Sequence, residues 1–324
     1  MRKAVYWITV SVAGLVFFGA MWVALQEPER RPPEDLTVEL SPERIARGTY
    51  LATHVARCVH CHSQQDTSKF GRPVIPGTEG AGGMCLGPST GFEGRICPPN
   101  ITPDPETGIG RWTDGELLRA MREGVNRRGE ALFPMMPYEK YRHALSDEDA
   151  HAIIAWMRSL PPQQRPTPRR DLPFPLGIAI KTLPAIVEGP VQPPRDTAEK
   201  RGWALAELAG CPICHTPIDA RHHPVEERHM AGGRPYPLGE GAVVTSANLT
   251  PHPDGLGDLS LEGLGERLGR HASPAPVEPA RNTVMPWQSF AGMEEADLAD
   301  LHAWLRSLRP LPGAVQPWGG VAEN

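Results

Sequence analysis

The sequence lacks several features that would place it in a common functional class. It has no excess of positive charge, since 33 Lys and Arg stand against 38 Asp and Glu for a net charge of -5. This balance argues against a generic surface for nucleic acid. It also has no phosphate-binding loop, no dinucleotide fingerprint and no Ser/His/Asp order. Nucleotide-dependent chemistry and hydrolysis by a serine nucleophile are therefore not indicated.

Cysteine is scarce too, but four of the six cysteines lie in a motif that occurs twice. The two copies are Cys58-Val59-His60-Cys61-His62 and Cys211-Pro212-Ile213-Cys214-His215. A Cys-x-x-Cys-His pentapeptide is the attachment site of a c-type haem, in which the thiols form thioethers and the histidine ligates the iron. A single copy could also be a redox dithiol or half of a zinc site. The sequence around each motif distinguishes between these interpretations.

The flanks of the two motifs match in order and at nearly equal spacing, which indicates an internal duplication. The paired landmarks are Arg47-Gly48 and Arg201-Gly202, Asn100 to Pro103 and Asn248 to Pro251, Met136-Pro137 and Met285-Pro286, and Ala155 to Leu160 and Ala303 to Leu308. Chance matches of unrelated motifs would not recur in this order. We therefore expect two homologous units, each carrying one covalently bound haem c. The predicted attachment residues are Cys58, Cys61, Cys211 and Cys214, with His62 and His215 as axial ligands.

A second axial ligand is predicted for each haem. Met136 and Met285 occupy the same register in the two halves, and each precedes a proline that favours an extended backbone. A methionine opposite the histidine gives an electron-transfer centre of raised potential. The other reading is that both methionines only fill the core. Met135 adjoins Met136 and is an alternative ligand, but the second half has Val284 at that place.

The N-terminal segment predicts export of the chain. Ala4 to Leu25 contains no charged residue, follows Arg2 and Lys3, and is long enough to cross a hydrocarbon core of about 30 Å as a helix. A cleaved signal peptide is the competing interpretation, although no clean cleavage site is present. We expect an anchor in a bacterial inner membrane over residues 1–26, single-pass, with the haem units in the periplasm.

The remaining boundaries follow from composition. Residues 27–40 are rich in Pro, Glu and Arg and predict a stalk, and residues 161–195 form a proline-rich connector between units at 41–160 and 196–309. Residues 310–324 are a Pro/Gly-rich tail. The connector is apolar enough that we expect it to lie along both units and fix their relative position.

The two remaining cysteines, Cys85 and Cys97, lie in an insertion of the first unit. The segment from Pro73 to Asn100 is longer than the matching segment from Pro235 to Asn248. Because an exported protein meets oxidising conditions, a disulfide is the economical interpretation. A labile regulatory pair is the alternative.

Several stretches of the first half resemble a known family. They are Arg47 to Ala52, Cys58 to His62, Asn100 to Asp104, Gly108 to Asp114, Met136 to Tyr138 and Leu145 to Asp149. They resemble the class I cytochrome c domains found in certain membrane-bound, multi-haem cytochrome subunits. These subunits belong to periplasmic dehydrogenases, such as alcohol dehydrogenase and gluconate dehydrogenase. The resemblance covers nearly all of residues 41–309. It implies an all-α fold of two tandem cytochrome c domains, with His/Met ligation. Together with the apolar segment Ala4 to Leu25, the expected architecture is two such domains behind an N-terminal transmembrane helix. Those subunits typically carry three haems, and a third motif is absent here.

The expected function is single-electron transfer by a membrane-tethered dihaem cytochrome c. Its partners would be a redox donor, such as a dehydrogenase catalytic subunit, and an acceptor in the respiratory chain. One alternative is a redox or ligand sensor. The other alternative is a haem enzyme, such as a dihaem peroxidase or a thiosulfate-oxidising cytochrome, which needs one iron with an open or exchangeable position. Methionines in register in both halves argue against that alternative. No catalytic residue is predicted.

Overall fold

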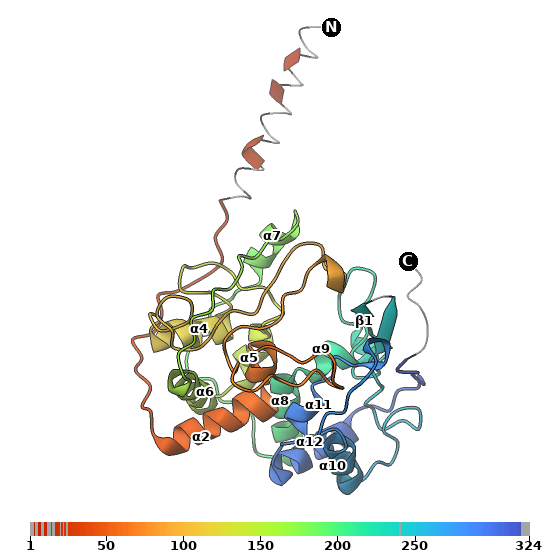
Figure 1. Ribbon diagram of the computed structural model, residues 1–324. Helices are drawn as coiled ribbons and strands as arrows, with labels where there is room; N and C mark the ends of the chain where they lie inside the picture. Colours follow the sequence, from red (N-terminus) through yellow and green to blue (C-terminus); the bar gives the residue numbers. More distant parts are fainter. Residues whose placement is uncertain are drawn as a thin grey trace.

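The elements of the chain fall into two sets of helices with a connector between them (Figure 1). The computed structural model describes residues 3, 6, 7, 10, 11, 14, 17–19, 21, 23, 25–239 and 241–318. The first half contains α2 (Pro42–Tyr50), the π-helical turn η1 (Leu51–Val55), α3 (Cys58–Cys61), the short 3-10 turn η2 (Pro88–Thr90), α4 (Asp114–Glu123), α5 (Tyr138–Ala144) and α6 (Asp147–Ser159). The connector contains α7 (Leu176–Ala179) and η3 (Ile180–Thr182). The second half contains α8 (Ala198–Ala209), α9 (Cys211–His215), η4 (Glu226–Arg228), β1 (Pro235–Gly239), β2 (Ala242–Thr245), α10 (Leu261–Gly269), η5 (Pro279–Arg281), α11 (Trp287–Phe290) and α12 (Glu295–Ser307).

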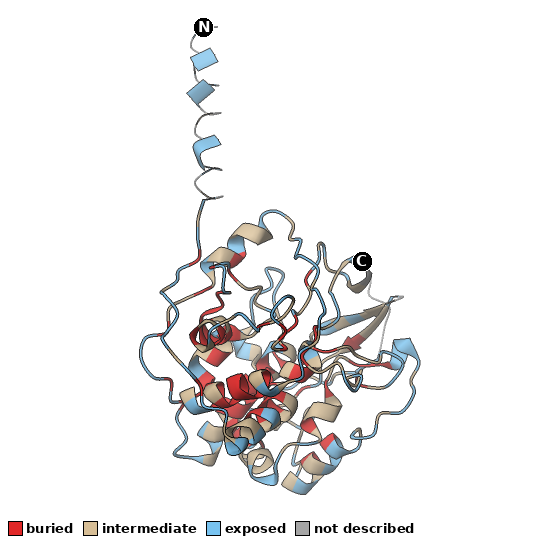
Figure 2. Ribbon diagram, turned by 60° about the vertical axis from the view of Figure 1, so that its left-hand side comes forward, coloured by how far each residue is buried: buried red, intermediate tan, exposed pale blue. Residues whose placement is uncertain are grey.

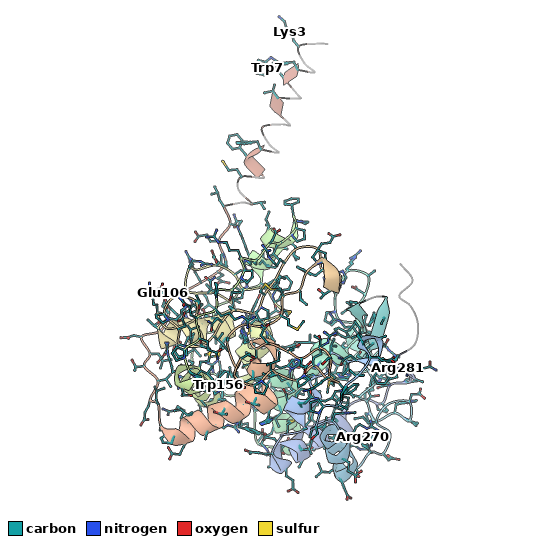
Figure 3. All side chains as sticks on the ribbon, viewed as in Figure 1. Lys3, Trp7, Glu106, Trp156, Arg270 and Arg281 are labelled. Carbon is teal, nitrogen blue, oxygen red and sulfur yellow. A yellow bond between two sulfur atoms is a disulfide. The ribbon has the colours of Figure 1, made fainter. Side chains whose placement is uncertain are left out.

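Each half is built on one close crossing of its first and last helices. In the first half α2 packs on α6, and a Cβ at Gly48 would clash with the carbonyl oxygen of Ala152. Trp156, labelled in Figure 3, lies on α6 at this crossing. In the second half α8 packs on α12, and a Cβ at Gly202 would clash with the carbonyl of Asp300. The repeated glycine therefore marks the place where two helix backbones meet.

Helix starts follow ordinary capping chemistry. The N-caps of α2, α6 and α8 are Ser41, Ser146 and Thr197, and each side-chain oxygen accepts from the backbone N–H three residues later. Thr113 caps α4 in a reciprocal capping box with Glu116. The acidic run after Ser146 lies in the first turn of α6, where carboxylates favour the helix dipole.

The expected all-α fold is wrong, because the second half contains a two-stranded antiparallel sheet. β1 pairs with β2, with Pro235 opposite Thr245 and Tyr236 opposite Val244. Aromatic and β-branched residues on either side of a glycine-containing turn favour such a hairpin. The prolines of β1 are tolerated because a strand of a two-stranded ribbon has one open edge.

The N-terminal transmembrane helix expected over residues 4–25 is also not supported. Among the described residues, no helix is both long and apolar enough to span a bilayer. Of that segment, residues 4, 5, 8, 9, 12, 13, 15, 16, 20, 22 and 24 lie outside the described part of the chain. Apolar composition indicates a capacity to enter lipid, but it does not by itself establish one continuous helix.

The two halves contact each other directly. Tyr50 donates its hydroxyl to Asp297 Oδ2 at 2.7 Å, and the side chain of Asn282 donates to the carbonyls of Thr67 and Lys69 at 3.0 Å each. His54 Nδ1 lies 2.8 Å from the carbonyl oxygen of Ser289. Figure 2 shows buried positions gathered in the middle of the folded part and exposed positions around them. These contacts fix the two halves against each other.

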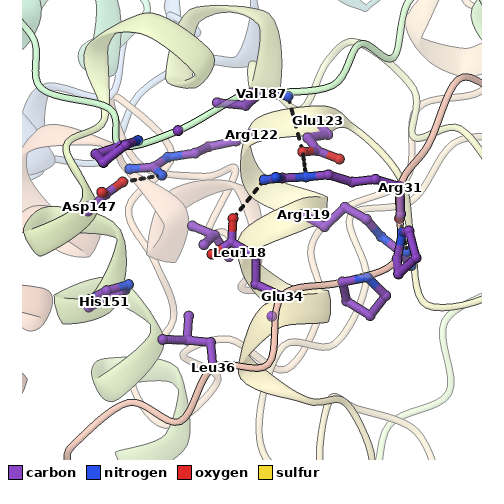
Figure 4. A pocket seen from close by; sticks show the side chains of 15 residues that line it. Arg31, Glu34, Leu36, Leu118, Arg119, Arg122, Glu123, Asp147, His151 and Val187 are labelled. Atoms are coloured by element: carbon purple, nitrogen blue, oxygen red, sulfur yellow. Dashed lines mark hydrogen bonds and ion pairs between the residues drawn. The ribbon is translucent and has the colours of Figure 1, made fainter.

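The connector packs mainly on the first half. Asp171 exchanges two backbone hydrogen bonds with Arg95, and Arg195 pairs with Asp149 at 2.6 Å. A cavity of about 290 Å³ lies where residues 31–36 and 187–190 meet α4 and α6 (Figure 4). Glu123, in its wall, accepts from Arg31 at 2.9 Å and from the N–H of Val187 at 3.1 Å. No residue of the Cys-x-x-Cys-His motifs lines this cavity, so it is a seam between packed segments and not the expected site.

Candidate haem attachment sites

The two Cys-x-x-Cys-His motifs form two short helices, α3 and α9, with the same entry geometry. The residue before each helix, Arg57 or Gly210, has a left-handed backbone, with φ 58° and ψ 30° in the first case and φ 69° and ψ 24° in the second. This bend turns the chain sharply from the preceding helix into the motif. None of the four motif cysteines takes part in a disulfide.

Both predicted axial histidines are held by a backbone carbonyl. His62 Nδ1 lies 2.7 Å from the carbonyl oxygen of Pro99, and His215 Nδ1 lies 2.7 Å from that of Ala247. A hydrogen bond from Nδ1–H fixes the ring tautomer and leaves Nε2 free to bind a metal. Burial lowers the pKa of both rings, against the opposing effect of these hydrogen bonds. Both imidazoles are therefore neutral at pH 7, which is the form that ligates iron.

The accepting carbonyls are positioned by the Asn-x-Thr landmarks that follow them. Asn248 Oδ1 accepts from the N–H and hydroxyl of Thr250, and its amide donates to the carbonyl of Leu311 at 2.9 Å. The same arrangement recurs at Asn100, whose amide donates to the carbonyl of Gln163 at 2.7 Å. Each asparagine thus ties the histidine-holding loop to the chain just beyond the last helix of its own half.

A second hydrogen bond at each of these histidines was not predicted from the sequence. The N–H of Gly82 donates to the carbonyl oxygen of His62 at 2.8 Å, and the N–H of Gly232 donates to that of His215 at 2.7 Å. Each histidine is therefore held at its main chain as well as at its ring. The available signal was the repeated tripeptide Ala-Gly-Gly, at residues 81–83 and 231–233.

The thiols do not resemble a redox dithiol. Burial, with a smaller effect of Cys61, raises the pKa of Cys58 to about 12, and burial raises that of Cys211 to about 12. Reactive dithiols instead have a lowered thiol pKa. Nor does a zinc site fit, because in the described part of the chain no three His, Cys, Asp or Glu side chains come together as a metal-binding group.

The structure also distinguishes the neighbouring methionines. Met136 packs against the core of the first half, whereas Met135 is 40% exposed. Met285 packs against the core of the second half. The carbonyls of Met136 and Met285 each accept from the N–H two residues later, so the Met-Pro turns share one geometry. Met136 and not Met135 corresponds to Met285.

Cys85 and Cys97 form a disulfide, as the sequence predicts. The bond closes a loop in which Leu86 pairs with Ile96 as an isolated antiparallel bridge. The insertion of the first half is therefore a clamped loop, while the shorter matching segment of the second half forms the β1–β2 hairpin.

Buried donors without partners test whether a haem fits these sites. Within the described residues, the Nε1 of Trp287 and the Nε of Arg57 are buried with no hydrogen-bond partner. Trp287 follows Met285 by two positions, and Arg57 directly precedes Cys58. Two cysteines outside any disulfide, one oriented imidazole and nearby unpaired donors are the groups expected around a haem c with its acidic propionates.

Comparison with known proteins agrees with this geometry. The family model described as Cytochrome c matches residues 45–161, which include the first motif. A diheme cytochrome c-type protein of Cereibacter sphaeroides is 34% identical over 261 residues, covering 78% of this chain and 80% of that protein. The gluconate 2-dehydrogenase cytochrome c subunit of Pantoea cypripedii is 32% identical over 288 residues, and the fructose dehydrogenase cytochrome subunit of Gluconobacter japonicus is 29% identical over 290.

The extent of these matches differs. The similarity covers 82% and 86% of this chain for the gluconate and fructose dehydrogenase subunits, but only 59% and 55% of those proteins. The chain therefore spans little more than half the length of these two dehydrogenase subunits. It spans most of the diheme relative. On the duplicated motif geometry and that similarity, the chain belongs to the family of dihaem c-type cytochromes, electron-transfer proteins with two covalently bound haem c groups.

Proposed function

We propose that this chain relays single electrons from a dehydrogenase catalytic subunit to an acceptor of the respiratory chain, in the periplasm. The observation that carries the proposal is the matched pair of sites, in which each half offers a carbonyl-held histidine and a core-packed methionine. Haem iron supplies a one-electron couple at each site. The names of the gluconate and fructose dehydrogenase relatives support a dehydrogenase as the donor.

The proposal assigns four residues to each haem. Cys58 and Cys61 would hold one haem with His62 and Met136 as axial ligands, and Cys211 and Cys214 would hold the other with His215 and Met285. Two protein ligands per iron leave no open position for a substrate, which favours electron transfer over chemistry at the iron. The disulfide between Cys85 and Cys97 supports the periplasmic placement, because disulfides persist in oxidising compartments.

Haem stoichiometry tests the attachment residues. Replacing Cys58 and Cys61 together by alanine should reduce the covalently bound haem from two groups per chain to one, and so should the Cys211/Cys214 double replacement. The matched control is the Cys85/Cys97 double replacement, which should keep both. Haem content is measured by mass spectrometry of the denatured protein. Two covalent haems in either motif variant would refute the assignment.

Axial ligation is tested at the methionines. Met136→Ala and Met285→Ala should each abolish the weak methionine-to-iron charge-transfer absorption of one haem, whereas Met135→Ala should leave both unchanged because Met135 is 40% exposed. A high-spin signal in the unmodified protein would instead favour the haem-enzyme alternative. The donor is tested by copurification with a dehydrogenase subunit whose substrate reduces the haems of the complex.

A further inference from the structure

Arg57 occupies a position where the backbone favours glycine. It precedes α3 with φ 58°, in the left-handed region, while Gly210 precedes α9 with φ 69°. A residue with a Cβ pays about 1 kcal/mol to adopt this conformation, and glycine does not. Gly210 therefore adopts the left-handed backbone without strain, whereas Arg57 adopts it with strain. The backbone alone gives no reason for an arginine here.

The side chain of Arg57 reaches the other half of the molecule. Its Nη2 lies 2.9 Å from the position that a Cβ on Gly210 would occupy. Its Cζ lies 5.7 Å from the centroid of the Phe290 ring, at the end of α11. The missing side chain at Gly210 thus leaves the space that the guanidinium fills. The residues that precede the two attachment helices fit each other across the interface.

In the described part of the chain, no carboxylate forms an ion pair with this guanidinium. The Nε of Arg57 is buried without a hydrogen-bond partner. Arg57 directly precedes Cys58, and its Nη2 lies beside Gly210, which directly precedes Cys211. The guanidinium therefore lies between the two motifs, close to the attachment cysteines of both. A buried guanidinium N–H without a partner is costly, so a bound hydrogen-bond acceptor is the expected compensation.

We propose that Arg57 acts on both haems. Its single positive charge stabilises the reduced form of each haem and raises both midpoint potentials. The inference rests on the proposed attachment of haem at both motifs. The potential of a haem depends on nearby charge and hydrogen bonding. A fixed cation disfavours the more positive ferric state, and its effect is larger in a buried site than in water.

Potentiometric titration of the holoprotein tests the proposal, with the absorption of each haem recorded at fixed pH and salt. Arg57→Gln removes the charge, and Arg57→Gly removes it while supplying the residue that the left-handed backbone favours. Both should shift the two midpoint potentials to lower values. Arg57→Lys keeps the charge and should leave both near those of the unmodified protein. Arg128→Gln removes the same charge from a side chain that is 77% exposed and should shift neither.

The outcomes separate this inference from the proposed function. If only the haem of the first half shifts, or neither does, Arg57 is not shared and the proposal is overturned. If Arg57→Lys lowers the potentials as much as Arg57→Gln, the charge is not the cause, which also overturns it. Failure of the haem assignment would show in the cysteine variants as unchanged stoichiometry. Failure of the Arg57 proposal would leave two haems in place with unshifted potentials.

Discussion

Replacing Asn248 by alanine should destabilise the second half by about 3 kcal/mol. The side chain is 3% exposed and makes three short hydrogen bonds, two from Thr250 and one to Leu311, at 2.8 to 2.9 Å. Each buried bond contributes about 1 kcal/mol net, and the truncation leaves its partners unpaired where water cannot reach them. Asn248→Asp should not rescue the loss, because it turns the donor facing the Leu311 carbonyl into an acceptor.

Guanidinium unfolding of the holoprotein, followed by circular dichroism and haem absorption, measures this effect. The matched control is Asn126→Ala, which also removes three side-chain hydrogen bonds but from a solvent-exposed turn. Water can replace those bonds, so the control should cost less than about 1 kcal/mol. The absorption of the haem held by His215 should also change, because Asn248 positions the Ala247 carbonyl. A cost for Asn248→Ala no larger than the control would refute the reasoning.

Three further predictions concern stability. Gly48→Ala should lower the free energy of unfolding by about 2 kcal/mol or more, because its Cβ would meet the α6 backbone. Gly269→Ala, on the open face of α10, should not lower it. Equal effects of the two substitutions in thermal or denaturant unfolding would contradict the close crossing. Removing the Cys85–Cys97 disulfide by double alanine replacement should cost about 3 kcal/mol by loop entropy, and no change in the denaturation midpoint would count against a structural role. Burial raises the pKa of Asp149, but the charges of Arg47 and Arg195 and their hydrogen bonds outweigh it, so this pKa is lowered. The contribution of Asp149 to folding stability is therefore present near pH 7 and is lost as the pH falls through the lowered pKa. Asp149→Asn should therefore cost about 1–2 kcal/mol at pH 7, given that both arginines are partly exposed, and should flatten the acid limb of the stability curve. Asp196, whose pKa the hydrogen bond from Lys200 also lowers, is exposed, so Asp196→Asn should change both much less. Equal changes of the acid limb in the two variants would exclude the Asp149 ion pairs as its source.

The duplicated sites could be predicted because their residues act through chemically distinctive side chains. Thiols, imidazoles and thioethers are few, and their matched spacing identified the two motifs and Met136 with Met285. The pairing of Cys85 with Cys97 followed from the commitment of the other four thiols. The close crossing at Gly48 and Gly202 appeared in the sequence only as a repeated glycine, whose purpose needed the helix geometry.

Other features carry no such signature. The carbonyls that hold His62 and His215 belong to Pro99 and Ala247, and a backbone acceptor can be supplied by any residue type. The β1–β2 hairpin is short and proline-containing, so tertiary context decided it against weak local preference. The strain at Arg57 and the space left by Gly210 become visible only when the two halves are placed together.

The asparagine contacts also bear on how the chain should be divided for expression. A gene fragment ending at residue 160 keeps every helix of the first half but omits the carbonyl of Gln163 and the hydroxyl of Thr167, which receive hydrogen bonds from Asn100. Such a fragment would leave a buried amide and the histidine-holding loop without their anchors. A fragment that runs through Thr167 retains both. In this protein the structural repeat therefore ends several residues beyond its last helix, and separated halves should be cut accordingly.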